Sequence, residues 1–465
     1  MLLPVVCAII YKEPEHWSLI SASFLTLAAG GLMYVLTMSD LKKELNLRDS
    51  YFTVTFVWVI LSLFGTLPYL LTETITDFAD ALFETVSGFT STGSSVISDV
   101  ESLPHSILFW RSLSQWLGGM GIIVLFLALI AGMGARGTQL FKAEAPGGPI
   151  INKISPRIRE TAQKLWLTYI IISIACCLML LIFGMNLFDA LCHTFTTMAT
   201  GGFSTKNASI GFYSNPYIQW TIIIFMFIGG TNFSLHYLAY KGRNPAVYIK
   251  SPEFRLYAGI ALSASFLVAL GLYWGGDIGK WGEQIRLASF QVVSIMTGTG
   301  YATADYNLWP STATGVLFLM MFVGGCIGST TGNIKVGRYL ILIRRVLMEL
   351  KKMIHPKAVL TMRSGDRVIN EDLVSNVAQF FFLYFMFLAL GVVGLTLLGL
   401  DVTSSLTASA ACLGNIGPGF AAVGPTQNYA FIPDAGKYLL SALMLIGRLE
   451  IFPMLVLLVP AYWKQ

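Results

Sequence analysis

The sequence predicts an all-α polytopic membrane protein, in which four similar units of helix, short pore helix and helix surround a central pore, preceded by an N-terminal helix pair. Three observations predict this fold. Of 465 residues, 55% are apolar and only 12% are charged, whereas about 25% are charged in a soluble domain. Apolar runs long enough to cross a bilayer recur along the chain, and one motif occurs four times. A chain so poor in charge cannot cover a water-facing surface, which excludes a soluble multi-domain enzyme.

Nine apolar runs have the roughly 20 residues that a membrane-crossing helix needs. They are 17–37, 51–72, 106–133, 165–185, 217–240, 255–274, 312–346 with an interruption, 373–399 and 436–462. The first run, 1–10, is too short to cross and lacks the basic start and cleavage site of a signal peptide. We interpret it as half of a first helix, which brings the expected number of spans to ten.

The distribution of Lys and Arg predicts the orientation. Of the 30 basic residues, 22 lie in segments 39–50, 134–164, 241–255 and 338–367 and in the C-terminal tail. Lys12, Arg111, Lys206, Lys280, Arg286 and Lys437 fall on the opposite side, and Lys335 and Arg448 fall inside membrane segments. By the positive-inside rule the side with 22 basic residues is cytoplasmic. The net charge of +5 therefore indicates topology, and nucleic-acid binding is not expected.

Four shorter apolar runs, at 78–91, 188–199, 284–297 and 401–413, have the length of re-entrant helices that enter the membrane and turn back. Under the predicted topology all four enter from the outer side. Each ends at a turn with Gly in the third place: Ser91-Thr92-Gly93-Ser94, Thr200-Gly201-Gly202-Phe203, Gly298-Thr299-Gly300-Tyr301 and Asn415-Ile416-Gly417-Pro418. Asp80 and Asp189, each 13 residues before such a Gly, are expected to cap their short helices.

A second matching feature follows each turn after 24 to 30 residues. It is a Gly pair in three units and a Gly-Arg pair in the fourth: Gly118-Gly119, Gly229-Gly230, Gly324-Gly325 and Gly447-Arg448. Such glycines can simply let helices pack closely, but four turns and four pairs in register favour a repeat. The predicted divisions are a helix pair and linker at 1–49 and pore repeats at 50–134, 135–241, 242–352 and 353–465.

Four Gly turns that enter from one side can converge on one axis and direct carbonyl oxygens inward, where they replace the water around a cation. The C-terminal ends of the short helices also favour a cation. Hydroxyl and amide oxygens beside the glycines suit a monovalent ion such as K⁺ or Na⁺. Because the turns hold no ring of carboxylates, a divalent-selective site is disfavoured.

These turns resemble those of the Trk/Ktr/HKT superfamily of potassium transporters, with the TrkH-type potassium uptake proteins as the most similar branch. The resemblance includes Trp116-Leu117-Gly118-Gly119-Met120-Gly121, the run from Gly324 to Gly332, and Gly447-Arg448-Leu449-Glu450. It implies potassium uptake across a bacterial inner (plasma) membrane, one pore per subunit, a homodimer, and a cytoplasmic TrkA-type nucleotide-binding regulatory ring. It implies K⁺ as the bound and transported ion, with no cofactor in this chain.

The resemblance also implies which residues form the K⁺ selectivity filter. They are Ser91, Thr92, Gly93, Thr200, Gly201, Gly202, Gly298, Thr299, Gly300, Asn415, Ile416 and Gly417. The preference for K⁺ over Na⁺ is implied by the same pattern, since all four turns contain Gly.

Arg448 takes the place that Gly has in the other three pairs. A charge at mid-membrane costs at least about 2.5–3.5 kcal/mol and indicates a functional site. If the pairs face the pore, the guanidinium opposes cation passage below the filter. The alternative is a structural ion pair with an acidic residue of another helix, because Glu450 does not share its helix face.

The stretch from Gly324 to Gly332 is too rich in Gly and hydroxyls for a continuous helix. Irregular backbone at this depth is tolerated where it lines a cavity, and the stretch is predicted to be a mobile gating loop. The alternative is a static kink. With Arg448, the gate candidates are Gly324, Gly325, Gly328, Ser329, Thr330, Thr331 and Gly332.

The largest cytoplasmic loop carries Lys351, Lys352, Lys357, Arg363 and Arg367, which can contact a partner ring or anionic membrane lipid.

Two other classes of membrane protein fit less well. A solute symporter with broken helices predicts inverted repeats, whereas these repeats run in one direction. An intramembrane enzyme needs paired acids or histidines at a membrane face, and the sequence shows no such pair. Passive conduction and H⁺- or Na⁺-coupled uptake are both compatible with the sequence.

Overall fold

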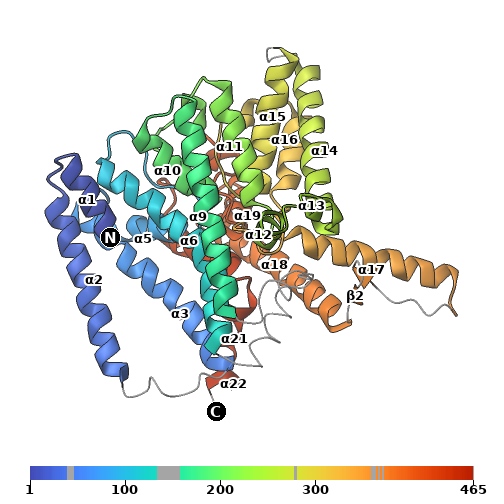
Figure 1. Ribbon diagram of the computed structural model, residues 1–465, viewed down its shortest axis with the longest axis horizontal. Helices are drawn as coiled ribbons and strands as arrows, with labels where there is room; N and C mark the ends of the chain where they lie inside the picture. The colour runs from blue at the N-terminus through green and yellow to red at the C-terminus, as the bar shows by residue number, and fades with distance from the viewer. Residues whose placement is uncertain are drawn as a thin grey trace.

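The computed structural model describes residues 1–38, 47–132, 158–276, 280–357, 363–364, 367–368 and 371–463. Apart from two strands of two residues each, all regular elements of the described chain are helices, as predicted (Figure 1). Part of the basic segments 39–50, 134–164 and 338–367, including the side chains of Arg363 and Arg367, lies outside the described residues. The boundary predicted at residues 134 and 135 lies outside them too.

The helices follow one another in a recurring order. The first group is α1 (Leu2–Ile10) and α2 (His16–Thr37), followed by α3 (Leu47–Gly65), α4 (Leu67–Leu71), α5 (Phe78–Phe89) and α6 (His105–Gly132). The second is α9 (Ile158–Ile182), α10 (Leu187–Met198), the 3₁₀ helix η2 (Ser209–Phe212), α11 (Pro216–Gly229), α12 (Phe233–Gly242) and α13 (Ala246–Lys250).

The third group is α14 (Pro252–Gly275), α15 (Trp281–Met296), η3 (Tyr306–Leu308), α16 (Ser311–Met320) and α17 (Val336–Ile354). The two-residue strands β1 (Arg363–Ser364) and β2 (Arg367–Val368) follow and pair antiparallel. The last group is α18 (Glu371–Leu397), α19 (Val402–Leu413), η4 (Ala421–Val423), α20 (Asp434–Arg448), α21 (Phe452–Leu458) and α22 (Pro460–Trp463).

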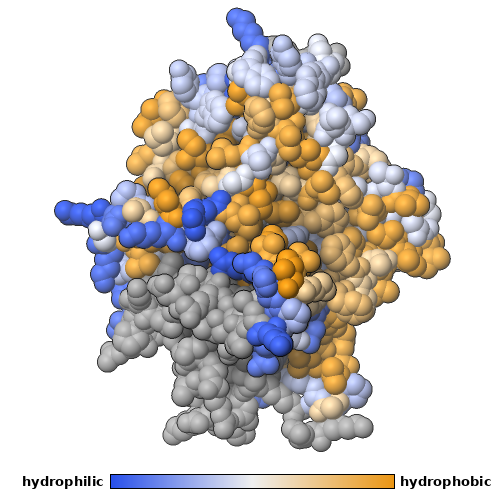
Figure 2. Space-filling view, turned by 90° about the vertical axis from the view of Figure 1, so that its right-hand side faces the viewer, coloured by the Kyte–Doolittle hydropathy of each residue, from blue (hydrophilic) through white to orange (hydrophobic). Residues whose placement is uncertain are grey.

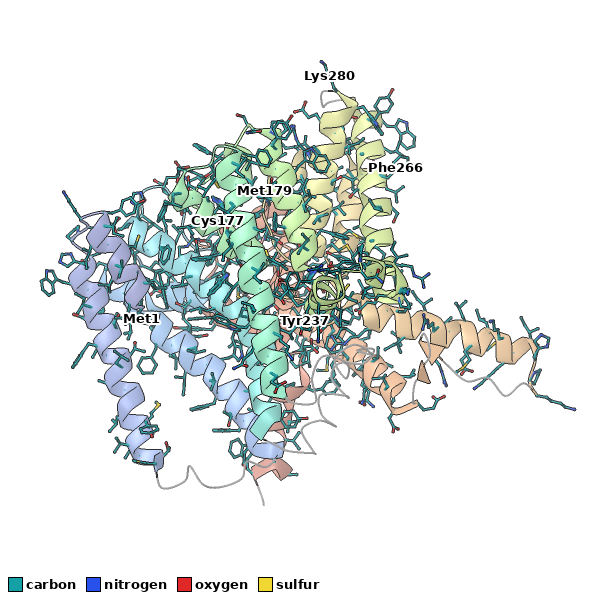
Figure 3. All side chains as sticks on the ribbon, viewed as in Figure 1. Met1, Cys177, Met179, Tyr237, Phe266 and Lys280 are labelled. Atoms are coloured by element: carbon teal, nitrogen blue, oxygen red, sulfur yellow. The ribbon has the colours of Figure 1, made fainter. Side chains whose placement is uncertain are left out.

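Five described helices are long and apolar enough to cross a membrane: His16–Thr37, Tyr51–Leu71, Ala162–Ile182, Pro252–Gly275 and Glu371–Leu397. Two bent helix pairs raise the number to seven if each pair is one span. Apolar side chains form a broad zone on the face shown in Figure 2, with hydrophilic side chains above and below it. In Figure 3, Phe266, 56% exposed, points outward from α14, and Lys280 lies at the tip beyond that helix. The chain is therefore a multi-pass membrane protein.

Helix α1 has nine residues. At about 1.5 Å per residue it extends about 14 Å, roughly half of the hydrocarbon core of a bilayer. The expectation that this run is too short to cross is confirmed. It packs against α2 and α6, so its apolar residues have a partner on the rest of the protein.

The predicted continuous helices over 217–240 and 436–462 are wrong. The chain bends by 97° between α11 and α12 and by 118° between α20 and α21. At the first bend Asn232 caps the new helix, with its side-chain oxygen 2.8 Å from the amide nitrogen of Ser234. At the second, Glu450 and Ile451 have φ of 60° and 69°, which an α-helix cannot contain. Hydropathy reports apolar length but not direction, so it missed both bends.

The interruption predicted within 312–346 is confirmed, because α16 ends at Met320 and α17 begins at Val336. Residues 321–335 form an irregular segment between them. Helix α17 then projects from the body of the molecule (Figure 1).

The four short helices α5, α10, α15 and α19 match the four predicted re-entrant runs. The expected capping role of Asp80 and Asp189 is wrong, because each is the third residue of its helix and another residue occupies the cap position. Asp77, Asn186 and Asp401 are the caps, and each side-chain oxygen accepts from backbone amides of the first turn. Hydrogen bonds from the side chain and backbone of Ser404 lower the pKa of Asp401 at the N-terminal end of α19. The caps therefore accept hydrogen bonds from first-turn amides that have no acceptor within the helix.

Each short helix packs against helices on both sides of it in sequence. Three also contact a helix of another group: α5 contacts α20, α10 contacts α6, and α15 contacts α11. These contacts bring the ends of the short helices to one central region.

Candidate functional site

The four turns that follow the short helices share one backbone conformation. We name them turn 1 (91–93), turn 2 (200–202), turn 3 (298–300) and turn 4 (415–417). The first residue of each turn has a positive φ, between 52° and 68°, and so has the third-place Gly, between 78° and 102°. Three of the first-place residues are Ser91, Thr200 and Asn415, for which this conformation is uncommon. A conformation repeated at four sites, three times in a non-Gly residue, indicates a shared geometric requirement.

The four turns form a closed ring. The Cα of each third-place Gly lies so close to the second-place carbonyl oxygen of the next turn that an added Cβ would overlap it. The pairs are Gly93 with Gly201, Gly202 with Thr299, Gly300 with Ile416, and Gly417 with Thr92. The last pair returns to turn 1. The third place of each turn therefore requires Gly for space as well as for its φ.

Most carbonyl oxygens of this ring lack a donor from the protein. Gly201 accepts from Gln115, and Gly417 accepts from Ser94 and Tyr429. The other ten carbonyl oxygens of the 12 turn residues accept no hydrogen bond from the residues that the structure describes. Buried carbonyl groups are normally paired. A ring of unpaired carbonyl oxygens is suited to hold a cation.

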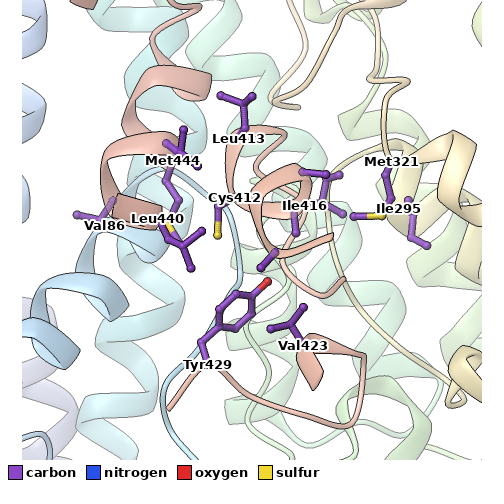
Figure 4. Packing of buried hydrophobic residues seen from close by; sticks show 14 of the residues in the cluster. Val86, Ile295, Met321, Cys412, Leu413, Ile416, Val423, Tyr429, Leu440 and Met444 are labelled. Atoms are coloured by element: carbon purple, nitrogen blue, oxygen red, sulfur yellow. The ribbon is translucent and has the colours of Figure 1, made fainter. Parts of the chain in front are cut away.

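Side chains hold the ring from outside. Gln115 of α6 donates to the Gly201 carbonyl oxygen at 2.7 Å and accepts from the Phe203 amide at 3.1 Å. In turn 4, Asn415 donates to Thr92 Oγ1 of turn 1 at 2.9 Å. Buried apolar side chains pack around turn 4, among them Cys412 and Ile416, and the Tyr429 ring lies close to them (Figure 4). The ring is thus enclosed by packed protein.

The segment 324–332 lies directly beside two of the turns. The Thr330 side chain donates to the carbonyl oxygens of Met198 and Gly229, at 3.0 and 3.2 Å, and its Oγ1 lies 3.4 Å from that of Thr200. A Cβ on Gly332 would lie 2.7 Å from the carbonyl oxygen of Gly414, immediately before turn 4. We name this segment the central loop.

Arg448 ends α20 and is 2% exposed. Its guanidinium donates to the carbonyl oxygens of Thr330 in the central loop, at 2.7 Å, and Gly118 in α6, at 3.0 Å. It has no carboxylate partner within the described part of the chain, and its Nε is buried with no acceptor. The structure therefore brings three predicted features together: the Gly pair of α6, the central loop and Arg448. The alternative of a structural ion pair for Arg448 has no support in the described residues.

Other charged groups hold the two ends of the central loop. The Glu253 carboxylate, in the first turn of α14, accepts from the Ile327 amide at 2.7 Å. Lys335 donates to the Thr331 carbonyl oxygen, and Arg338 in α17 pairs with Glu450, just beyond Arg448. Charged side chains from three helices and from the segment beside them are thus grouped around this loop.

Sequence reasoning missed the residues that support the ring. Gln115 escaped notice because it lies within a predicted span. Arg111 lies within the same predicted span, and the sequence did not reveal that it is buried, 2% exposed, against Glu84 of α5. In both cases the available signal was a polar residue inside an apolar run, but this signal did not identify the group that the residue contacts.

Comparison with known proteins agrees with this architecture. Residues 16–268 and 278–465 match the TrkH family, described as cation transport proteins. The chain belongs to the TrkH family. Its members are transporters and not enzymes.

Relatives of this TrkH-family chain include the Trk system potassium uptake protein TrkH of Salmonella typhimurium, 39% identical over 100% of this chain and 96% of the relative. The potassium uptake protein TrkG of Escherichia coli is 35% identical over 100% of this chain and 95% of its own length. Among solved structures, the potassium transporter TrkH from Vibrio parahaemolyticus matches with a TM-score of 0.89 and 35% identity, covering 100% of this chain and 96% of that one.

Replacing Gly93 by Ala tests the closed ring. A Cβ there would overlap the Gly201 carbonyl oxygen, and φ is 86°. Ala at a positive φ destabilises by more than about 1 kcal/mol. We expect Gly93→Ala to lower the melting temperature and abolish cation flux in liposomes.

Gly259→Ala in α14 is the matched control, because nothing lies within 4 Å of a Cβ there. Ala is favoured over Gly in a helix interior by roughly 0.5–1 kcal/mol. This variant should keep its flux and melt no lower than the wild type. Wild-type flux in Gly93→Ala would contradict the close contact.

Proposed function

We propose that this chain takes up K⁺ across the bacterial inner membrane through a pore whose selectivity filter is the ring of turns 1 to 4. The observation that carries the proposal is the closed ring with ten unpaired carbonyl oxygens. The full-length relatives named as potassium uptake proteins support the choice of ion. The filter residues are the 12 residues of the four turns, and each turn belongs to one of four repeats, 50–134, 135–241, 242–352 and 353–465.

Neutral carbonyl oxygens favour a monovalent ion over a divalent one, because they replace hydration water without adding fixed negative charge. The four short helices direct their C-terminal ends toward the ring, and the partial negative charge of a helix C-terminus attracts cations. Both effects act on any small monovalent cation. The preference for K⁺ over Na⁺ therefore rests on the size of the ring.

The gate in this proposal consists of Arg448 and the central loop, with Gly324, Gly325, Gly328, Ser329, Thr330, Thr331 and Gly332. The hydrogen bond between Arg448 and the Thr330 carbonyl oxygen supports it, because this bond joins the charge to the loop beside the filter. A guanidinium next to the path raises the energy of a passing cation. Displacement of the loop would carry the Thr330 acceptor away from Arg448 and reopen the path.

The subunit arrangement is proposed as well. A homodimer with one pore per subunit, a cytoplasmic TrkA-type nucleotide-binding ring and contacts with membrane lipid follow from the resemblance to Trk systems. The basic side of the chain would face the cytoplasm and the filter the outside. Lys351, Lys352 and Lys357 lie at the end of α17 and directly after it, where a partner ring or anionic headgroups could reach them.

Purified protein in planar bilayers tests this function. With K⁺ on one side and Na⁺ on the other, the reversal potential should follow the K⁺ gradient. With equal K⁺ and a pH gradient, passive conduction predicts a reversal potential of zero, and proton coupling predicts a shifted one; a Na⁺ gradient at equal K⁺ tests Na⁺ coupling in the same way. A reversal potential that ignores K⁺ would overturn the proposal.

Arg448→Ala should raise basal K⁺ flux into liposomes by at least about tenfold, since a unit charge 4 Å from an ion contributes about 4 kcal/mol at an effective dielectric constant of 20. Arg448→Lys keeps the charge and should keep the flux within a few-fold of the wild type. Flux through Arg448→Ala at or below the wild-type level would rule out its role as a barrier.

Deletion of residues 328–330 tests the central loop. The deletion removes the Thr330 carbonyl oxygen that binds Arg448 and the hydroxyl that binds Met198 and Gly229. We expect higher basal flux in the same liposome assay. Thr330→Ser keeps both groups and should conduct like the wild type. If the folded deletion variant shows unchanged flux, the loop is a static kink.

A further inference from the structure

A buried ion pair lies behind turns 1 and 2. It joins Glu84 of the short helix α5 to Arg111 of α6, and the side chains are 0% and 2% exposed. Glu84 lies nine residues before Gly93, and Arg111 lies one helical turn before Gln115, which holds the Gly201 carbonyl. Neither charged residue belongs to the proposed filter or gate.

The Glu84 carboxylate fixes the chain that leaves turn 1. Its Oε2 lies 3.0 Å from Ser95 Oγ and 3.0 Å from the Val96 amide nitrogen, both of which donate to it. Its Oε1 accepts from Arg111 Nε at 2.8 Å. The two residues just beyond Ser94 are therefore held by a carboxylate from the same unit.

The Arg111 guanidinium extends this support to turn 2. Its Nη2 donates to Ser95 Oγ at 3.2 Å, and its Nη1 donates to the carbonyl oxygen of Ser204, two residues beyond Gly202, at 3.2 Å. Its carbon Cζ lies 4.1 Å from the ring centre of Phe203. One side chain thus links the chain segments that leave two adjacent turns.

In the next two units as well, the residue nine positions before the third-place Gly forms a hydrogen bond with the segment that follows the turn. His193 forms a hydrogen bond between Nε2 and Ser204 Oγ at 2.9 Å, and Gln291 donates to the Tyr301 carbonyl oxygen at 3.2 Å. The fourth unit has Ala408 there, and the neighbouring Thr407 donates to the Phe420 carbonyl oxygen at 3.0 Å. In the first unit the corresponding contacts are made by a charged pair, and they extend to the segment that follows a second turn.

We propose that the Glu84–Arg111 pair is a selectivity-determining brace, which holds turns 1 and 2 at the spacing that favours K⁺ over Na⁺ without contacting the ion. The proposal rests on the proposed function of the ring. Buried ion pairs contribute little net stability, because desolvation offsets their attraction. Their hydrogen bonds are directional, and the planar guanidinium fixes its partners in both angle and distance. The pair therefore fixes the positions of the segments beside the ring more than it adds to stability.

The test uses full-length protein in bilayers, with the K⁺/Na⁺ permeability ratio taken from the bi-ionic reversal potential. Glu84→Gln keeps the shape and an acceptor oxygen but loses the charge that orients Arg111. We expect a roughly tenfold lower ratio, the effect of a charge-assisted hydrogen bond on an equilibrium, with Na⁺ permeability rising while K⁺ still passes. Arg111→Lys keeps the charge without the planar fork, and we expect a smaller decrease.

The matched control is Lys437→Met. Lys437 is also buried, 5% exposed, and pairs with Asp80 of α5, but the contacts described for it do not reach the segments that leave the turns. This variant should keep the wild-type ratio. A decrease equal to that of Glu84→Gln would overturn the proposal, because any buried pair in this region would then have the same effect.

The outcomes separate the brace from the function itself. A wild-type protein without preference for K⁺ contradicts the proposed function. A selective wild type with unchanged ratios in Glu84→Gln and Arg111→Lys contradicts only the brace, as does an equal loss of K⁺ and Na⁺ permeability. If either variant fails to fold, Ser95→Ala leaves the pair intact and removes the hydroxyl that both residues bind. An unchanged ratio in that variant also overturns the brace.

Discussion

The contact between each third-place Gly and the carbonyl oxygen of the next turn is the constraint on which the architecture depends. Four such contacts close a ring, and they require four short helices to end at one depth and at equal spacing around one axis. Irregular backbone is tolerated within a membrane only where protein or a water-filled cavity surrounds it. The turns must therefore be enclosed by long apolar helices, which explains why so much of a 465-residue chain surrounds 12 residues.

The ring of turns is nearly symmetric, but the four helices that follow the turns and precede or carry the Gly pairs are not. Helix α6 continues past its Gly pair to Gly132, whereas α11 and α20 end at Gly229 and Arg448, and α16 ends at Met320, before its pair. At the breaks, backbone groups without a helical partner form other hydrogen bonds: the Cys326 amide donates to the Gly230 carbonyl oxygen at 2.8 Å, and the Thr330 carbonyl oxygen accepts from Arg448, which also donates to the Gly118 carbonyl oxygen in α6. The break between α16 and α17 therefore supplies one acceptor of Arg448, the Thr330 carbonyl oxygen, and the continuous helix α6 supplies the other. A continuous helix over 312–346 would have used the Thr330 carbonyl oxygen internally.

Much of the fold could be predicted from the sequence, because apolar length and the register of the turns are local properties. The four short helices and the interruption before α17 followed from these signals. The bends after Gly229 and Arg448 did not, since hydropathy carries no direction. The positive φ of Ser91, Thr200 and Asn415 was equally hidden, because the ring imposes it and these residue types do not. The pairing of Arg111 was hidden for a related reason: its partner Glu84 is 27 residues away, and only the packing of α5 on α6 joins them.

In the proposed filter, the ring and the side chains that support it have separate roles in ion selectivity. Carbonyl oxygens attract K⁺ and Na⁺ alike, and Na⁺, the smaller ion, is disfavoured only if the oxygens cannot move inward to meet it. The glycine contacts limit such movement within the ring, because each third-place Cα already lies against the next carbonyl group. The segments that follow turns 1 to 3 are held in addition by side chains from α5, α6, α10 and α15. In the proposed filter, discrimination between two ions of equal charge therefore depends on residues that the ion never touches.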